Sequence, residues 1–201
     1  MEKLTRALIF FAAALASACA QSAETGTEGD VIFELQVTGY AGHGEDGSLL
    51  ATQLYAEKPL PSRDVSVFLV AHRDQDFHSV YAGLARKFGE LQLGVGFGNA
   101  WYDGIRHPTV NPWLYYAKED VEAYLTVEHY ARDDQAPWYY KGHASKRISD
   151  SYFLGVYGEK DLGVGPMIGW RSEAFRIWAS VPLVSRPESG ARGVAGVQVE
   201  F

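Results

Sequence analysis

The feature that most constrains this chain is a repeated alternation of apolar and polar residues with a period of two. In the segment 91–98, four large apolar residues alternate with Gln92 and three glycines. A β-strand turns successive side chains to opposite faces, so this pattern predicts a strand with one apolar and one polar face. Similar segments recur about every 14 residues between turn-forming residues. No stretch after position 30 has the periodicity of a helix, and we expect an all-β chain.

We expect about twelve strands, with ten as the alternative. The eighth segment is the most polar, and the division between the ninth and tenth is weakly marked. Twelve strands of ~10 residues leave only short connections and no plug domain. The expected segments are 31–41, 48–58, 65–73, 77–88, 91–98, 108–117, 121–131, 138–148, 152–159, 164–171, 175–184 and 192–201.

The first twenty residues have the pattern of a secretory signal peptide. Lys3 and Arg6 precede an apolar run at 7–16, and small residues flank a cleavage point before Gln21. The run is shorter than the ~20 apolar residues that a membrane-spanning helix needs. We therefore expect a signal peptide at 1–20, a mobile polar tail at 21–30 and one barrel domain at 31–201.

Cysteine content and net charge limit the possible partners. The only cysteine is Cys19, so cleavage after it leaves no thiol, disulfide or cysteine metal site. The alternative is that Cys19 becomes a lipidated first residue, although Ala16 stands where lipoprotein signals usually have leucine. Residues 21–201 carry 16 basic and 24 acidic residues, a net charge of −8. Nucleic acid is not an expected partner, because it requires a clustered basic surface.

The last eight residues, Val194 to Phe201, resemble the carboxy-terminal assembly signal of bacterial outer-membrane β-barrels. Gly196 occupies its third position, Val199 its sixth and an aromatic residue its last. Val194 departs from the pattern, which usually starts with a polar residue. The resemblance implies a porin-like closed antiparallel transmembrane β-barrel and identifies no specific family. It also implies the Gram-negative outer membrane as location, after secretion across the inner membrane. The implied partners are outer-membrane lipid, lipopolysaccharide and, through the last strand, the barrel-assembly machinery.

Alternation alone does not decide which face points inward. A soluble sandwich or barrel hides its apolar face, whereas a membrane barrel turns that face to lipid. The membrane barrel is favoured because no helix is available to cover the sheet. It predicts an outer-rim aromatic girdle at Tyr40, Phe77, Trp101, Tyr102, Tyr130 and Trp138. It predicts a periplasmic girdle at Phe88, Tyr116, Tyr152, Trp170, Phe175 and Phe201.

Prolines within the segments count against strands, because each removes a backbone donor. We expect Pro112, Pro166 and Pro182 near the outer ends of their strands, where the ladder can fray.

Charged residues on the polar faces are candidates for the lining of the lumen. They could select solutes by charge, as rings of side chains do in channels. Alternatively, they could neutralise one another inside a closed barrel. Their mixed signs argue against strong ion selectivity. The candidates are Glu34, Glu57, Glu122, Glu128, Lys141, Arg147, Arg171, Arg176, Arg192 and Glu200.

One outer hairpin has the residue types of a metal site. His72, Asp74, Asp76 and His78 occur at every second position and could converge on a divalent cation. An ordinary solvated acidic turn explains the same residues, and we assign no metal or other cofactor.

The sequence indicates no catalytic group. His78 and Ser79 are neighbours in a strand and point to opposite faces, so they cannot act together. His129 and Glu128 have the same problem, and His107 has no serine motif beside it. We therefore expect no enzyme but a passive pore for small solutes. The alternatives are a closed barrel with a structural or surface-interaction role and, as the weakest, a lipid-modifying enzyme.

Overall fold

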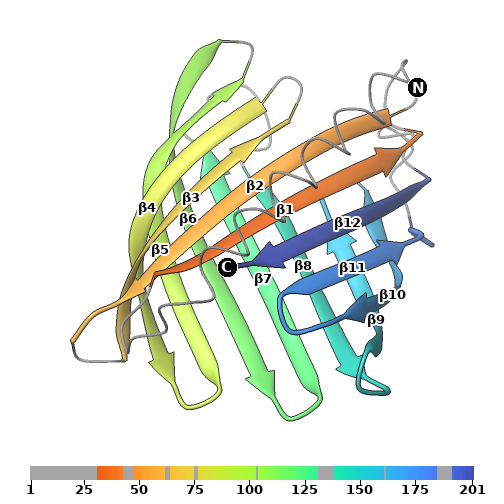
Figure 1. Cartoon of the computed structure of the whole chain (residues 1–201). Helices are drawn as coiled ribbons and strands as arrows, with labels where there is room; N and C mark the ends of the chain where they lie inside the picture. Colours follow the sequence, from red (N-terminus) through yellow and green to blue (C-terminus); the bar gives the residue numbers. More distant parts are fainter. Residues whose placement is uncertain are drawn as a thin grey trace.

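The computed structural model describes residues 31–42, 48–61, 64–74, 77–102, 104–130, 138–160, 162–184 and 192–201. Twelve antiparallel strands form one closed barrel (Figure 1), which confirms the expected fold class and strand number. The predicted signal peptide, Cys19 and the polar tail lie outside the described residues. The strands are β1 (Ile32–Ala41), β2 (Ser48–Pro59), β3 (Val65–Arg73), β4 (Phe77–Phe88), β5 (Leu91–Tyr102), β6 (Ile105–Lys118), β7 (Val121–Tyr130), β8 (Trp138–Arg147), β9 (Tyr152–Glu159), β10 (Gly163–Arg171), β11 (Phe175–Ser180) and β12 (Gly193–Glu200).

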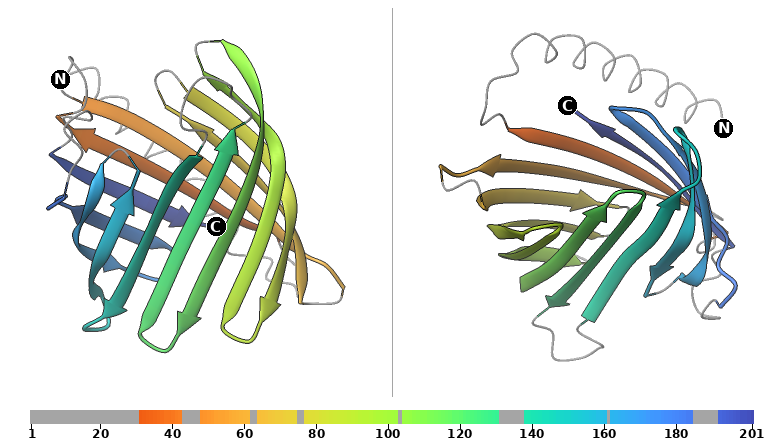
Figure 2. Two further views of the ribbon diagram at one scale, coloured as in Figure 1. Left: turned by 180° about the vertical axis from the view of Figure 1, so that it is seen from behind. Right: turned by 90° about the horizontal axis from the view of Figure 1, so that it is seen from below.

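The first and last strands close the barrel. Each strand pairs with its neighbours in sequence, and β12 returns to lie beside β1 (Figures 1 and 2). The β1–β12 register sets Glu34 opposite Glu200. Beyond that pair, the amide of Phe201 donates to the carbonyl of Phe33 at 2.8 Å. Closure leaves no exposed sheet edge, which would otherwise invite aggregation.

The apolar face of the sheet points outward. Leu93 and Leu125, expected to face lipid, are 43% and 40% exposed. Glu122 and Gln198 instead line the interior of the barrel. This arrangement confirms the expected orientation and is the reverse of a soluble barrel, which would gather the leucines in its core. Within the described residues, no helix is long and apolar enough to cross a membrane.

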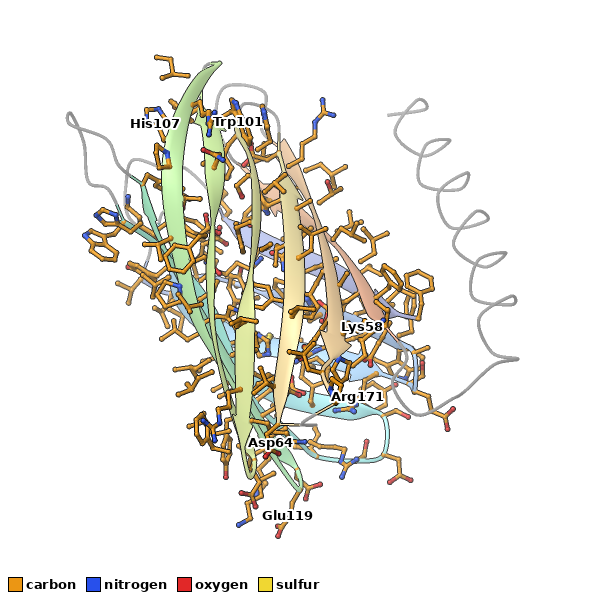
Figure 3. The ribbon with its side chains drawn as sticks, turned by 90° about the vertical axis from the view of Figure 1, so that its left-hand side faces the viewer. Lys58, Asp64, Trp101, His107, Glu119 and Arg171 are labelled. Atoms are coloured by element: carbon orange, nitrogen blue, oxygen red, sulfur yellow. The ribbon has the colours of Figure 1, made fainter. Side chains whose placement is uncertain are left out.

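The two ends of the barrel differ. We call the end that carries Phe201 the terminal end; it includes the two-residue connections Gly89–Glu90 and Glu119–Asp120. In Figure 3 it carries the labels Lys58, Asp64, Glu119 and Arg171, whereas Trp101 and His107 mark the opposite end, here the far end. Both tight connections begin with a left-handed residue: φ is 62° at Gly89 and 52° at Glu119. Such a φ suits glycine and strains most other residues.

The placement of Pro112 differs from the expectation. Because β6 begins at Ile105, this proline lies in the middle of its strand and not near an end. The β6–β7 ladder is interrupted there. The Asn111 amide donates to the Val127 carbonyl at 3.2 Å and to the Thr126 hydroxyl at 2.7 Å. A side chain thus supplies the donor that proline lacks. Pro166, the fourth of nine residues in β10, is also close to the middle of its strand, whereas Pro182 follows β11 at the far end, as expected.

The aromatic girdles are only partly as predicted. Exposed aromatic residues do occur near strand ends, among them Phe88, Tyr152 and Trp138. The prediction was wrong for three members of the outer-rim girdle, which point into the barrel. Alternation explains this, because each shares the face of polar inward residues on its own strand. The three are Tyr40, Phe77 and Tyr130.

Inward glycines make room for aromatic rings. The Trp113 indole lies over Gly94 of the neighbouring strand, and the Trp178 indole lies over Gly196. A β-carbon on Gly94 would stand 2.2 Å from Cε2 of Trp113. Together with Phe68, the Trp113 ring forms a packed cluster inside the barrel. The interior is therefore filled to a large extent by aromatic side chains.

Replacing Gly94 by alanine is expected to destabilise the barrel by about 1–3 kcal/mol, because the rigid indole must move to admit the methyl group. Denaturant titration of the refolded protein measures this loss, and tryptophan fluorescence reports the displaced ring. Gly39→Ala is the matched control, since a β-carbon on Gly39 would meet nothing within 4 Å. Equal stability of the two variants would contradict this account of the packing.

Candidate functional site: the lumen

The half of the lumen nearer the terminal end contains a cavity of about 330 Å³. Its wall includes aromatic residues, glutamines and charged side chains from strands on all sides of the barrel. Of the ten charged residues that the sequence suggested, the following line it: Glu34, Glu57, Glu122, Lys141, Arg171, Arg176 and Glu200.

The other three suggested residues lie elsewhere. Arg147 lines a second cavity of about 160 Å³ at the terminal end and bonds to Asp120 at 2.7 Å. Glu128 is buried nearer the far end, away from both cavities. Arg192 is exposed just before β12.

Glu122 is the centre of an ion-pair network. Its carboxylate pairs with Arg176 on β11, and its other oxygen lies 3.7 Å from Nη1 of Arg171 on β10. The Arg176 guanidinium also packs over the Phe153 ring, 4.3 Å from its centroid. Glu122, Arg171 and Arg176 line both cavities and therefore stand between them. Removing one partner of such a network leaves an uncompensated charge, which is costly.

Two further polar residues of this network, His143 and Ser145, were not among the charged candidates for the lumen lining. They are two positions apart in β8, and this spacing puts both on the lumen face. His143 Nε2 lies 3.2 Å from Glu122 Oε1, and the Ser145 hydroxyl donates to the same oxygen at 3.3 Å. Arg176 also donates to Ser145 Oγ at 3.4 Å. These bonds join both residues to one carboxylate, whereas a catalytic relay would place the histidine between serine and acid.

The charges in the main cavity are separated between two parts of its wall. Three of the five carboxylates come from neighbouring strands: Glu200 from β12, Glu34 from β1 and Glu57 from β2. The other two, Glu122 on β7 and Glu173 between β10 and β11, lie on the side of the cations. Cations come from β8, β10 and β11, with Lys141 on β8. Glu57 accepts hydrogen bonds from Tyr55, Ser66 and Gln92, which hold it against the wall.

The half of the lumen nearer the far end contains a buried carboxylate, Glu159, at the end of β9. The Tyr139 and Tyr157 hydroxyls donate to it at 2.5 and 2.6 Å. Tyr40 reaches it from β1, with its hydroxyl 3.0 and 3.1 Å from the two oxygens. The strand register places Lys141 opposite Glu159. Only 7% of Glu159 is exposed, so hydrogen bonds from the phenols replace those that water would otherwise donate to this carboxylate.

A second buried carboxylate, Glu128, has a similar environment. Tyr130 donates to it from the same strand at 2.6 Å, and Tyr81 donates from β4 at 3.3 Å. Phe77 of β4 packs against the Tyr130 ring, 5.7 Å between centroids. Strands β4 and β7 are not neighbours, so these contacts cross the lumen. The alternation of side chains along each strand could have placed these residues inside the barrel. It could not have shown which of them contact one another.

Of the suggested metal ligands, His72 and Asp74 lie close together, with Nε2 3.8 Å from Oδ2, but His78 does not join them. His72 packs against Phe77, with ring centroids 5.7 Å apart, whereas His78 stacks on Trp101 at 5.0 Å. Asp74 accepts a bond from the Phe77 amide at 2.8 Å, as in an ordinary turn. Asp76 lies outside the described residues. Across the part of the chain that the structure describes, no three His, Cys, Asp or Glu residues are grouped to hold a metal ion.

No protein-family model matches this chain, and no curated protein matches it in sequence. Among solved structures, it resembles the KdgM porin with a TM-score of 0.52 and 13% identity, covering 85% of this chain and 99% of the porin. It also resembles outer membrane phospholipase A from Escherichia coli, with a TM-score of 0.52 and 9% identity, covering 84% and 92%. At such identities the likeness establishes the fold alone. The fold is that of the outer-membrane β-barrels, which here include a porin and an enzyme.

Proposed function

We propose that this chain is a small barrel of the Gram-negative outer membrane and acts as a passive pore for small solutes. One observation carries the proposal: a closed barrel exposes apolar side chains and encloses a charged cavity of about 330 Å³. Only lipid makes such an outer surface favourable, because water penalises a continuous apolar belt. The shared fold of the porin and this chain is consistent with the proposal.

The partners follow from the same surface. Outer-membrane lipid and lipopolysaccharide would cover the apolar belt, and the barrel-assembly machinery would act on β12. We propose secretion across the inner membrane as the route, guided by residues 1–20. The proposal includes no nucleic-acid partner and no cofactor.

The lining of the cavity supports weak selectivity among solutes. Five carboxylates and three lysine or arginine side chains contribute to it, and part of this charge is neutralised in the Glu122 network. We therefore propose a slight preference for cations, set by the carboxylates that have no arginine beside them. The contributors are Glu34, Glu57, Glu122, Glu173, Glu200, Lys141, Arg171 and Arg176.

The purified protein is expected to produce discrete conductance steps in planar bilayers, with a reversal potential in a KCl gradient slightly on the cation side. Glu34→Lys should move that potential to the anion side, because it reverses one charge of the acidic wall. The control is Glu90→Lys at the exposed turn between β4 and β5, which should leave the potential unchanged. Absence of steps from folded protein would overturn the pore proposal.

The second candidate function is a closed barrel with a structural or surface-interaction role. It is favoured by the filled half of the lumen, where Tyr40, Tyr81 and Glu159 are each more than nine-tenths buried. It predicts folded protein without conductance. A lipid-modifying enzyme is the weakest candidate, and we assign no catalytic role to His143 or Ser145, since both bond to Glu122.

A further inference from the structure

We infer that two clusters of phenols around buried carboxylates act as a gate in the lumen, and that this gate limits conduction. The clusters are Tyr40, Tyr139 and Tyr157 around Glu159, and Tyr81 and Tyr130 around Glu128. The inference rests on the proposed pore function and locates its narrowest part.

Contacts across the lumen carry the inference. Tyr40 is on β1 and Glu159 is on β9, and in the barrel three strands separate them on one side. Tyr81 on β4 and Glu128 on β7 are separated by two strands. Each bond therefore connects one part of the wall to another and crosses the path that a solute would follow.

The extent of the cavity agrees with this position. Its lining reaches Asn111, Trp113 and Tyr157 in the middle of the barrel and includes neither Glu128 nor Glu159. Beyond that level the two carboxylates are buried. Solutes from the terminal end would enter the cavity and meet the phenols at its inner limit.

The chemistry of the clusters suits a reversible closure. A phenol that donates to an ionised carboxylate makes a bond stronger than one between neutral groups. Hydrogen bonds attach the Tyr40 and Tyr81 hydroxyls to their acceptors across the lumen, while the two rings pack in the interior clusters. Rotation of both side chains out of these positions would open the path. Without its hydroxyl, a ring of nearly the same size loses that attachment.

The test compares single-channel records of the wild type with the double variant Tyr40→Phe/Tyr81→Phe. We expect the variant to spend at least ten-fold more of its time open, because both cross-lumen bonds are lost while the rings remain. The matched control is Tyr140→Phe/Tyr152→Phe, the same chemical change on exposed tyrosines, which should behave as the wild type. Circular dichroism and the heat-dependent gel shift of barrels verify that each variant is folded.

A second variant guards against misfolding of the first. Glu128→Gln/Glu159→Gln keeps the size of both acceptors but removes their charge, and should also raise the open fraction, by a smaller factor. If the wild type and folded variants conduct with equal open fractions, the gate is rejected and the pore stands. If none of the folded proteins conducts, the pore itself is rejected, and the gate with it.

Discussion

Deletion of Phe201 is expected to lower the amount of folded barrel in the outer membrane at least ten-fold. Its amide and carbonyl form the last rung between β12 and β1, with Phe201 N 2.8 Å from Phe33 O and Phe33 N 3.4 Å from Phe201 O. The residue is also the terminal aromatic of the assembly signal that this segment resembles. The deletion thus removes a closing contact and, under the proposed role of β12 in assembly, a recognition element. The heat-dependent gel shift of isolated membranes measures the folded fraction.

Two controls separate recognition from stability. Phe201→Tyr keeps an aromatic ring and all backbone bonds, and should assemble nearly as the wild type does. The deleted chain, refolded in detergent without any assembly machinery, should regain the barrel with only a modest loss of stability. Normal membrane levels of the deleted chain would show that Phe201 has no part in assembly.

Leu125→Arg is expected to destabilise the barrel in lipid vesicles by about 2–4 kcal/mol, because it places a charge on the lipid face near the bilayer midplane. Leu125 is in the middle of β7, opposite Leu114 of β6, and is 40% exposed. Urea titration in vesicles of defined lipid measures the free energy of unfolding.

The matched control uses the same substitution at another depth. Val121 begins β7 at the terminal end, on the same outer face of the same strand as Leu125, and is 43% exposed, so Val121→Arg should cost only about 0–1 kcal/mol. A soluble barrel would tolerate arginine equally at both exposed positions. Equal costs at the two depths would therefore contradict membrane insertion.

The fold could be predicted from the sequence because every second residue of a strand faces the same environment, so its polarity shows which face is apolar. The alternation at Leu91–Phe97 defined both the strand and its lipid-facing side, and the same logic defined the other strands. Strand ends were less certain. We placed the start of β6 at Pro108, whereas the strand begins at Ile105, which pairs with Tyr102 of β5.

The lumen could be predicted only in part. The alternation along their strands predicted that Glu34 and Arg176 face the lumen, but it carries no information about their partners across the barrel. The association of Tyr40 with Glu159 depends on closure and on the register of all intervening strands. Tyr40 was therefore assigned to an interfacial girdle, where tyrosine is common. Two-residue spacing also puts His143 and Ser145 on one face of the polar segment 138–148, but only charged residues were chosen as candidates for the lining.

The two indoles that lie on glycines have a mechanical consequence. Trp113 and Gly94 join β6 to β5, and Trp178 and Gly196 join β11 to β12. In a ring of twelve strands these pairs are on opposite arcs. If the bilayer pushes inward on either arc, the indole is pressed against the backbone of the glycine beside it. Close-packed groups of this kind are hard to compress. The cross-section should therefore resist flattening as lateral pressure rises.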